Sequence, residues 1–275
     1  MKLRRQREPR IKATDVIGIP DTPQHKELRF DPDTILSQEE YKEIINELGH
    51  YVQWDATANY ADMAYNLCIL FPERRQEVAS DAIWPALERE TADYRESGLW
   101  DHYLPLAMKL AIIYPEKKKD LGLDEARDDI RKWLDKQRKR KTWDEYVPRA
   151  VMASTLYPDK MQEFRDEAAR SSATERIEAF RHDRKWDDFA TEAAERALLF
   201  PEKKRTPVRE TDWDGMADQL AYLRQIKSWD NYVRFAAQLA ILEADEAEIT
   251  RDGQIMLGRK PSMAASRPLP ERPAV

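Results

Sequence analysis

A tryptophan–aspartate pair recurs in this chain at a constant interval of 43 residues. The pairs begin at Trp100, Trp143, Trp186 and Trp229. A proline follows fifteen positions after each of the first three tryptophans, and a further proline, Pro72, lies one interval upstream. A fixed period of this length is the signature of one structural unit copied several times. The repeat therefore constrains the architecture strongly and the chemistry very little.

Each unit shows a regular pattern of rings and small residues when positions are counted from the tryptophan as zero. Position 3 is aromatic in every unit (Tyr60, Tyr103, Tyr146, Phe189 and Tyr232), and position 7 is always alanine (Ala64, Ala107, Ala150, Ala193 and Ala236). Positions 0, 3, 7, 11 and 14 share one face of a helix, and alanine there permits two helices to approach closely. We interpret the tryptophans and alanines as structural repeat positions, and Trp143→Ala should cost about 3 to 5 kcal/mol of stability.

The sequence also marks where the helices of each unit begin and end. The aspartate after each tryptophan falls in a first helical turn, where a carboxylate complements the helix dipole, and Thr142 and Ser228 are candidate N-caps. The proline fifteen positions on ends the helix and starts a turn. A second apolar series with the same interval follows (Leu87, Ile130, Ala173 and Met216). Each unit is thus predicted to be a helical hairpin.

The repeats divide the chain into three parts. We expect an extended basic arm over residues 1–36, a helical repeat domain over 37–249 and a proline-rich flexible tail over 250–275. The units are expected near residues 54–96, 97–139, 140–182, 183–225 and 226–249. The predicted fold class is all-α, an α-solenoid of about five stacked helical hairpins with a preceding lone helix.

The two ends of the repeat domain depart from the pattern. The lone helix is predicted over residues 37–53, with a capping box formed by Ser37 and Glu40. The first unit has Thr57 where the others have tryptophan, and the last has Ala244 where the others have proline. Since the terminal units of an open stack face water, we interpret both departures as caps.

The stacked hairpins resemble the helical-repeat solenoid class that includes HEAT, armadillo and TPR proteins, and the resemblance covers roughly residues 37–249. The 43-residue period is nearest to the HEAT range, whereas the TPR spacing of about 34 residues is absent. The resemblance implies a curved scaffold with an extended binding surface. It transfers no functional residues, because this class shares no catalytic motif.

Composition excludes several other classes of protein. The net charge is −6, with 36% charged and 41% hydrophobic residues and seven glycines, a mixture typical of solvated helices. The single cysteine, Cys68, lies in an apolar segment and is interpreted as a reduced, buried thiol. The sequence shows neither a membrane-spanning run nor a signal peptide. We therefore expect a cytoplasmic protein.

The polar residues form no catalytic or metal-binding pattern in the sequence. The histidines at 25, 50, 102 and 182 are scattered, and a glycine-rich phosphate loop is missing. Adjacent carboxylates such as Asp187 and Asp188 are expected by chance among 52 acidic residues, and we interpret them as solvated helix faces. The sequence thus predicts no catalytic residues, no metal site and no cofactor.

Basic residues are the most suggestive polar feature. Candidate anion- or partner-binding side chains occur in the arm (Arg4, Arg5, Arg7 and Arg10), after the prolines (Arg74, Arg75, Lys117, Lys118, Lys119, Lys203, Lys204 and Arg205) and before Trp143 (Lys139, Arg140 and Lys141). Stacked units would align them along two edges, where they could follow a phosphate backbone. The alternative is that they cap helix carboxyl ends and oppose the helix dipole.

These observations lead to two main functional hypotheses. The first is a non-enzymatic helical-repeat scaffold that mediates protein–protein interaction or assembles a larger complex. The alternative is an RNA- or ribosome-associated repeat protein that uses the basic arm and the basic edges. An enzyme hidden in the concave surface is a third and weaker hypothesis.

Overall fold

The computed structural model describes residues 36–200 and 208–243, and every regular element in these ranges is helical. An inner layer contains α3 (Thr57–Leu70), α6 (Trp100–Ile113), α8 (Trp143–Leu156), α11 (Trp186–Leu199) and α13 (Trp229–Glu243). An outer layer contains α2 (Gln38–Gln53), α5 (Trp84–Glu96), α7 (Leu123–Arg140), α10 (Glu167–His182) and α12 (Glu210–Gln225). The predicted all-α class is confirmed. The predicted tail, and the arm apart from Leu36, lie outside the described residues.

The hairpins begin and end where local chemistry dictates. The aromatic residues before the prolines leave the helical conformation, with φ of −125° at Tyr114 and −126° at Tyr157, because proline excludes the helical region for the residue before it. The prolines then start short 3-10 turns, η3 (Pro72–Arg74), η4 (Pro115–Leu121) and η5 (Pro158–Lys160). After two of these turns come short helices, α4 (Arg75–Val78) and α9 (Met161–Phe164). The chain thereby passes from the inner to the outer layer.

The turn back to the inner layer contains one residue in the left-handed backbone conformation in every unit. The residue two positions before the tryptophan position has φ between 53° and 66° (Asp55, Gly98, Lys141, Arg184 and Lys227). Glycine adopts this conformation without strain, whereas other side chains pay a modest cost. The conformation ends the outer helix and reverses the chain. This turn is therefore a second repeated structural feature, although its residue type varies.

The helix caps agree only in part with the sequence. The predicted capping box is confirmed, since the Glu40 amide donates to Ser37 Oγ at 3.2 Å and the Ser37 amide donates to the Glu40 carboxylate at 2.8 Å. Thr142 occupies the N-cap position of α8, but its hydroxyl donates to Gln137 Oε1 at 3.2 Å. The interpretation of Thr142 as a side-chain cap is wrong, because its hydroxyl oxygen accepts no hydrogen bond from the first-turn amides of α8.

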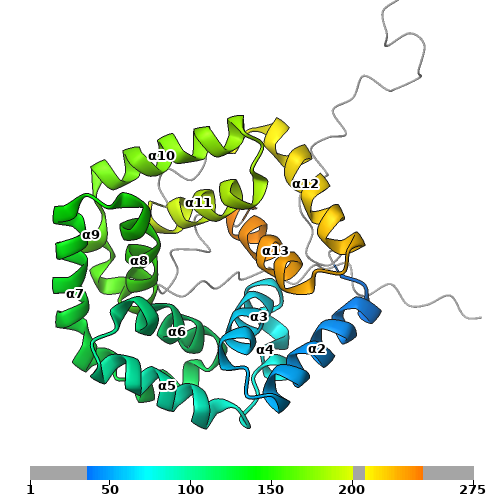
Figure 1. Cartoon of the computed structure of the whole chain (residues 1–275), viewed down its shortest axis with the longest axis horizontal. Coiled ribbons are helices and arrows are strands. Elements are labelled where there is room, and N and C mark those ends of the chain that lie inside the picture. The colour runs from blue at the N-terminus through cyan, green and yellow to red at the C-terminus, as the bar shows by residue number, and fades with distance from the viewer. Residues whose placement is uncertain (1–35, 201–207, 244–275) are drawn as a thin grey trace, which may run out of the picture.

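The hairpins form a closed ring (Figure 1). Each inner helix packs against the next one along the chain, and α13 packs against α3 in turn. The outer helices follow one another around the perimeter. The hairpins therefore curve back onto their own beginning, and the interpretation of the terminal units as caps facing water is wrong.

Apolar and charged contacts both contribute to this closure. Met63 of α3 and Phe235 of α13 occupy the same repeat position and are 1% and 0% exposed, within one continuous apolar cluster. On the perimeter, Arg224 of α12 pairs with Glu40 of α2 at 2.5 Å, and this guanidinium lowers the pKa of Glu40 to about 2. The first and last units are thus joined to each other.

Tyrosine hydroxyls attach the loops to the inner helices. At position 3 each hydroxyl donates to a main-chain carbonyl 18 residues later, from Tyr60 to Val78, Tyr103 to Leu121 and Tyr146 to Phe164. At position 14 each donates to a carbonyl 34 residues earlier, from Tyr114 to Ser80 and Tyr157 to Leu123. These bonds satisfy loop carbonyls that packing removes from water. Each such loop is therefore held by its own unit or by the next one.

The repeated tryptophans lie at the edge of the core. Each indole meets the ring at position 3 edge-on, with centroids 5.7 to 5.9 Å apart. Trp229 is buried, whereas Trp100, Trp143 and Trp186 are only half-buried. The alanines at position 7 are all 0% exposed. The indoles are less buried than expected because they stand in the first turn, at the end of the helix.

Trp143→Ala is accordingly expected to lower the free energy of unfolding by about 2 kcal/mol, less than a fully buried ring would. The variant loses the edge-on contact with Tyr146 and the packing on the neighbouring apolar cluster. Urea denaturation measures the change, and Trp143→Phe, which retains a ring, should lose less. A cost below about 0.5 kcal/mol would indicate an indole that is free to bind a ligand.

Candidate ligand-binding cavity

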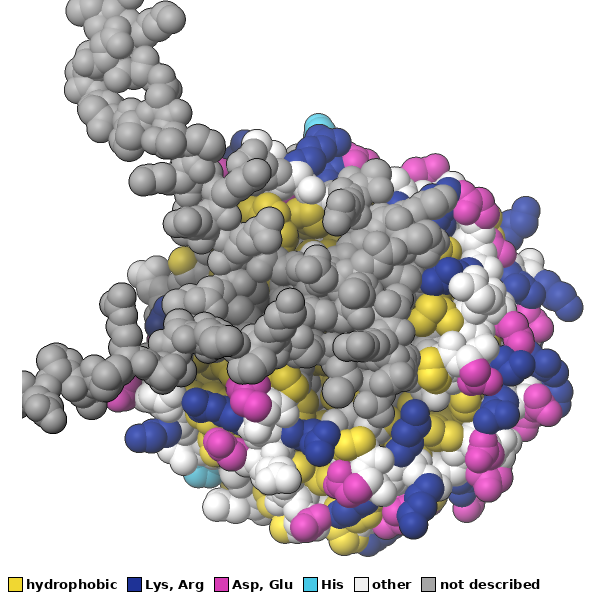
Figure 2. Space-filling model, turned by 180° about the vertical axis from the view of Figure 1, so that it is seen from behind, with side chains coloured by type: hydrophobic (Ala, Val, Ile, Leu, Met, Phe, Trp, Pro, Cys, Tyr) yellow, Lys and Arg dark blue, Asp and Glu magenta, His cyan; other side chains and the backbone are white. Residues whose placement is uncertain are grey.

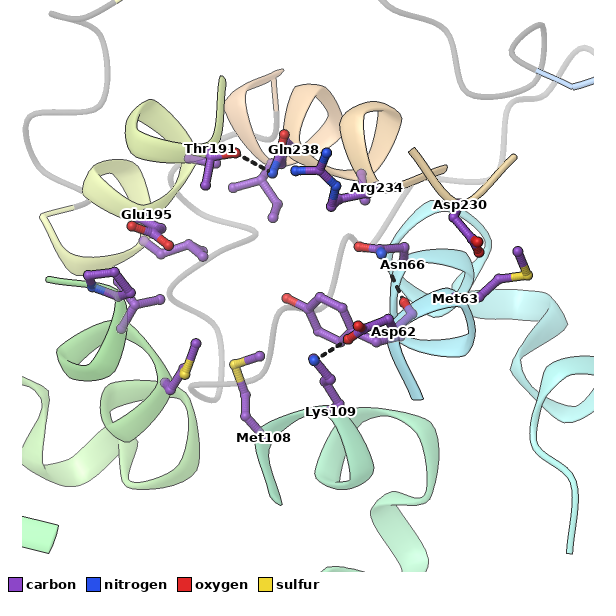
Figure 3. Close-up of a pocket in the computed structure, with 18 of the residues that line it drawn as sticks. Asp62, Met63, Asn66, Met108, Lys109, Thr191, Glu195, Asp230, Arg234 and Gln238 are labelled. Carbon is purple, nitrogen blue, oxygen red and sulfur yellow. Dashed lines mark hydrogen bonds and ion pairs between the residues drawn. The ribbon is translucent and has the colours of Figure 1, made fainter. Parts of the chain in front are cut away.

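A cavity of about 400 Å³ lies at the axis of the ring (Figure 3). Side chains of α3, α6, α8, α11 and α13 all contribute to its wall, mostly from positions 5, 8, 9 and 12. Because successive residues of a helix are rotated by about 100°, position 9 points almost opposite to the alanine at position 7. The packing face and the cavity face of the repeat are thus distinct. The volume lies within the usual range for ligand pockets.

The wall of the cavity differs from unit to unit. Position 9 holds Asn66, Lys109, Met152, Glu195 and Gln238. Position 5 holds Asp62, Pro105, Pro148, Thr191 and Arg234. The repeated units therefore share the residues that pack the ring and differ in the residues that face its axis. Such divergence is the pattern expected where a surface recognises one particular ligand.

Both basic side chains of the wall form an ion pair with a neighbouring helix, and Figure 3 shows the pair of Lys109. Lys109 of α6 forms an ion pair with Asp62 of α3, and the Asn66 amide donates to the Asp62 carbonyl at 2.8 Å. Arg234 of α13 donates to Asp187 of α11 at 2.9 Å. The two ion pairs join adjacent inner helices, and they neutralise both Lys109 and Arg234.

Gln238 of the cavity wall has one polar atom without a hydrogen bond. Its Nε2 donates to Thr191 Oγ1 at 2.7 Å, and the Thr191 hydroxyl donates in turn to the Asp187 carbonyl at 2.9 Å. Because the Thr191 proton is used in the second bond, the Gln238 atom facing Thr191 must be the amide nitrogen. Among the described residues nothing donates to Gln238 Oε1, which is buried.

Glu195 brings an unpaired carboxyl from α11, across the cavity from Asp62 and Asn66 (Figure 3). In the described part of the chain it forms no hydrogen bond or ion pair. Burial raises its pKa to about 8, Glu192 adds to the rise, and Arg176 opposes it. Arg176 itself pairs with Glu192 at 2.5 Å. The carboxyl is therefore mostly protonated at neutral pH, as a buried acid without a counter-ion should be.

The raised pKa of Glu195 predicts a loss of stability in alkali. The folded-state pKa of about 8 exceeds the ordinary 4.5, so this stabilisation is complete below about pH 4.5 and is lost as the pH rises through 8. Glu195→Gln keeps the shape without the charge and should abolish the loss. Urea denaturation of both proteins at about pH 6 and about pH 9 measures it. An equal dependence on pH in the two proteins would contradict the assignment.

The basic residues after the prolines take part in packing the loops. The Arg74 guanidinium lies 4.5 Å from the Tyr41 ring centroid. Lys117 pairs with Asp81 at 2.5 Å and lies 4.7 Å from the Trp84 ring centroid. Arg75, Lys118 and Lys119 belong to the same connections, while Lys203, Lys204 and Arg205 lie outside the described residues. Arg74 and Lys117 thus have structural partners.

The basic residues before Trp143 lie at the opposite end of the inner helices. Lys139, Arg140 and Lys141 are exposed at the end of α7, and Lys141 is the left-handed residue of the turn. The arm residues Arg4, Arg5, Arg7 and Arg10 lie outside the described residues. The described members of the predicted basic set do not line the cavity. The structure therefore separates the basic clusters from the axis.

Charges of both signs are mixed on the outer surface. On the face seen in Figure 2, basic and acidic side chains alternate over the described helices. Along α7, Arg127 pairs with Asp124 at 2.5 Å and Lys132 with Asp129 at 2.9 Å. Exposed pairs of this kind contribute little to stability. These charges mainly solvate α7. Asp187, interpreted from the sequence as part of a solvated face, instead pairs with Arg234 of α13 at 2.9 Å.

The residues of the cavity do not stand out in the sequence. Glu195 and Gln238 are two of many polar residues, and they differ from the packing residues only in that their shared repeat position, position 9, holds a different residue in every unit. The interpretation of Cys68 as a buried thiol is confirmed, since the thiol is free and buried and burial raises its pKa to about 12. The polar groups of the cavity wall that sequence patterns do not reveal are the Glu195 carboxyl and the Gln238 amide.

Within residues 36–200 and 208–243, none of the helices is both long and apolar enough to cross a membrane. The same residues contain no group of three or more His, Cys, Asp or Glu side chains placed to hold a metal ion. Comparison with protein families, curated proteins and solved structures finds no match for this chain.

Proposed function

We propose that this chain is a non-enzymatic binding scaffold, in which the helical ring is the frame and the axial cavity is the recognition site. The observation that carries the proposal is the contrast between two faces of the same helices. Alanine repeats at position 7, where the helices pack, and position 9 differs in every unit, where the helices face the cavity. Packing explains the first pattern, and binding of one ligand explains the second.

The composition of the wall supports this proposal. Ligand pockets are mostly apolar and contain a few polar groups that fix orientation. Met63, Met108 and Leu198 contribute apolar surface here, while Glu195 and Gln238 contribute the polar groups. Ion pairs between inner helices hold the wall in place without a ligand, so little ordering is required on binding. The partner is a protein, part of which enters the cavity, or a larger assembly that presents such a segment.

Filling the cavity tests the proposal. Met152→Trp places a large ring at the wall, whereas the control Tyr222→Trp changes an aromatic side chain that is 54% exposed on α12. We expect the wild type and the control to capture a stoichiometric protein partner, and Met152→Trp to lose it. Native mass spectrometry of the complexes measures the stoichiometry. Equal capture by all three proteins, or a turnover activity abolished by one polar substitution, would contradict the proposal.

A second candidate function is RNA binding. Lys139, Arg140 and Lys141 favour it, because these consecutive cations are exposed and form no ion pair with the described residues. Contacts between basic side chains and RNA phosphates release counter-ions, so the affinity for RNA must fall steeply as the salt concentration rises. Fluorescence anisotropy of a single-stranded RNA across a salt series, with the triple alanine variant as comparison, tests it. Absence of binding at low salt, or equal binding by the variant, contradicts a role for this cluster.

A further inference from the structure

The free polar groups of the cavity select the charge of its ligand. The Glu195 carboxyl has no partner among the described residues, and once ionised it accepts hydrogen bonds. Asp230 adds another acidic side chain to the wall. Lys109 and Arg234, in contrast, are already paired with carboxylates. A ligand with N–H donors and a positive charge therefore gains partners, whereas an anion would meet unpaired acceptors.

The rest of the wall suits an alkyl chain beside such a cation. Burial raises the pKa of the Tyr65 hydroxyl of α3, and the charge of Glu195 raises it further. An aromatic ring therefore lies near the Glu195 carboxyl. Met63, Met108 and Met152 add flexible thioethers from three inner helices. Aromatic faces attract ammonium groups, and methionine adapts to varied apolar shapes.

We propose that the axial cavity binds a primary alkylammonium group, with the Glu195 carboxylate as its hydrogen-bond acceptor. This inference rests on the proposed function and names the chemistry that the cavity recognises. The group belongs either to a free amine or to a lysine side chain of the protein partner. On binding, the Glu195 carboxylic acid releases its proton to solvent, and the resulting carboxylate pairs with the ammonium ion.

Proton release makes the affinity depend on pH. Below about pH 8 the cation must displace the Glu195 proton, so the affinity should rise by up to about tenfold per pH unit and level off above it. The charged and titratable groups around Glu195 and across the cavity are Glu192 of α11, Arg176 of α10, Tyr65 and Asp62 of α3, Lys109 of α6, and Asp230 and Arg234 of α13. The first two pair with each other, and Lys109 and Arg234 are paired with aspartates. Glu195 is thus the group whose ionisation the ligand changes.

Isothermal titration calorimetry with hexylammonium tests the inference on the full chain, with hexanol and hexanoate as neutral and anionic analogues. We expect hexylammonium to bind at least about tenfold more tightly than either analogue at pH 8. Glu195→Gln should weaken binding at least about tenfold and remove its dependence on pH. Glu145→Gln, a matched change of an exposed carboxylate on α8 outside the cavity, should bind like the wild type. Hexanol binding as tightly as hexylammonium, or undiminished binding by Glu195→Gln, would overturn the inference.

A parallel titration with a short lysine peptide and its norleucine counterpart distinguishes the two sources of the ammonium group. Tighter binding of the lysine peptide than of hexylammonium identifies a protein side chain, and the reverse order identifies a free amine. If hexylammonium fails to bind while Met152→Trp still abolishes partner capture, the ammonium inference falls and the proposed function stands. If hexylammonium binds but filling the cavity leaves partner capture unchanged, the proposed function falls and the cation site stands.

Discussion

Replacing Asp212 with alanine is expected to lower the free energy of unfolding by about 3 to 5 kcal/mol. Asp212 is 2% exposed. Its carboxylate accepts both a bond from Arg181 Nε at 3.0 Å and one from the Arg209 amide at 2.7 Å. The side chain of Arg181 is itself only 9% exposed and lies 5.1 Å from the Phe189 ring centroid. The variant removes the buried anion, leaves the Arg209 amide without its acceptor, and leaves the Arg181 guanidinium with the half-exposed Glu178 carboxylate between α10 and α12.

Asp129→Ala is the matched control for this prediction. It removes an aspartate whose pair with Lys132 on α7 is well exposed, so the expected cost is below about 1 kcal/mol. Urea denaturation of the wild type and both variants gives the comparison. Equal, small losses in the two variants would mean that the Arg181–Asp212 pair is hydrated and does not join α10 to α12.

Phe235→Ala is expected to cost about 3 to 5 kcal/mol, because it leaves a cavity where the ring closes. Phe235 is 0% exposed in α13, the helix that packs against both α11 and α3. The ring of Phe235 belongs to the apolar cluster that also contains Met63 of α3. The size of the loss therefore reports the burial of Phe235 in this cluster.

Arg149→Ala provides a control at the same repeat position of another unit. Arg149 pairs with Asp101 at 2.7 Å on the surface of α8, so the expected loss is below about 1 kcal/mol. Chemical denaturation with circular dichroism measures both variants. A loss for Phe235→Ala as small as that for Arg149→Ala would contradict the burial of Phe235 in the apolar cluster.

The helical hairpins could be predicted because their determinants are local. The aromatic–proline pair ends a helix wherever it stands, and the inner helices begin at Trp100, Trp143, Trp186 and Trp229 as the repeat indicates. Closure was missed because it depends on the sum of small angles between successive hairpins, which no single unit encodes. One feature of the sequence does indicate closure. Position 6 of the repeat is apolar in the two terminal units, with Met63 and Phe235, whereas two middle units have Arg149 and Glu192 there. Terminal units that faced water would carry polar residues at this position.

The cavity was harder to predict than the fold. Glu195 and Gln238 lie 43 residues apart and meet the same space only because their helices surround one axis. The raised pKa of Glu195 comes mainly from burial, which depends on helices distant in sequence. The unused acceptor of Gln238 likewise follows from the direction of the Thr191 hydroxyl. Repeat alignment can identify positions that diverge, but a hydrogen-bond inventory requires coordinates.

The contact between α13 and α3 also changes how the molecule can come apart. Open repeat arrays unfold progressively from their ends, since a terminal unit breaks one interface whereas an internal unit breaks two. In this ring every inner helix of the described chain has a neighbour on both sides, so local opening anywhere breaks two interfaces. Amide hydrogen exchange should therefore show similar protection in α3, α8 and α13 instead of a gradient toward the ends. Closing the repeat makes the opening of a terminal unit as costly as the opening of an internal one.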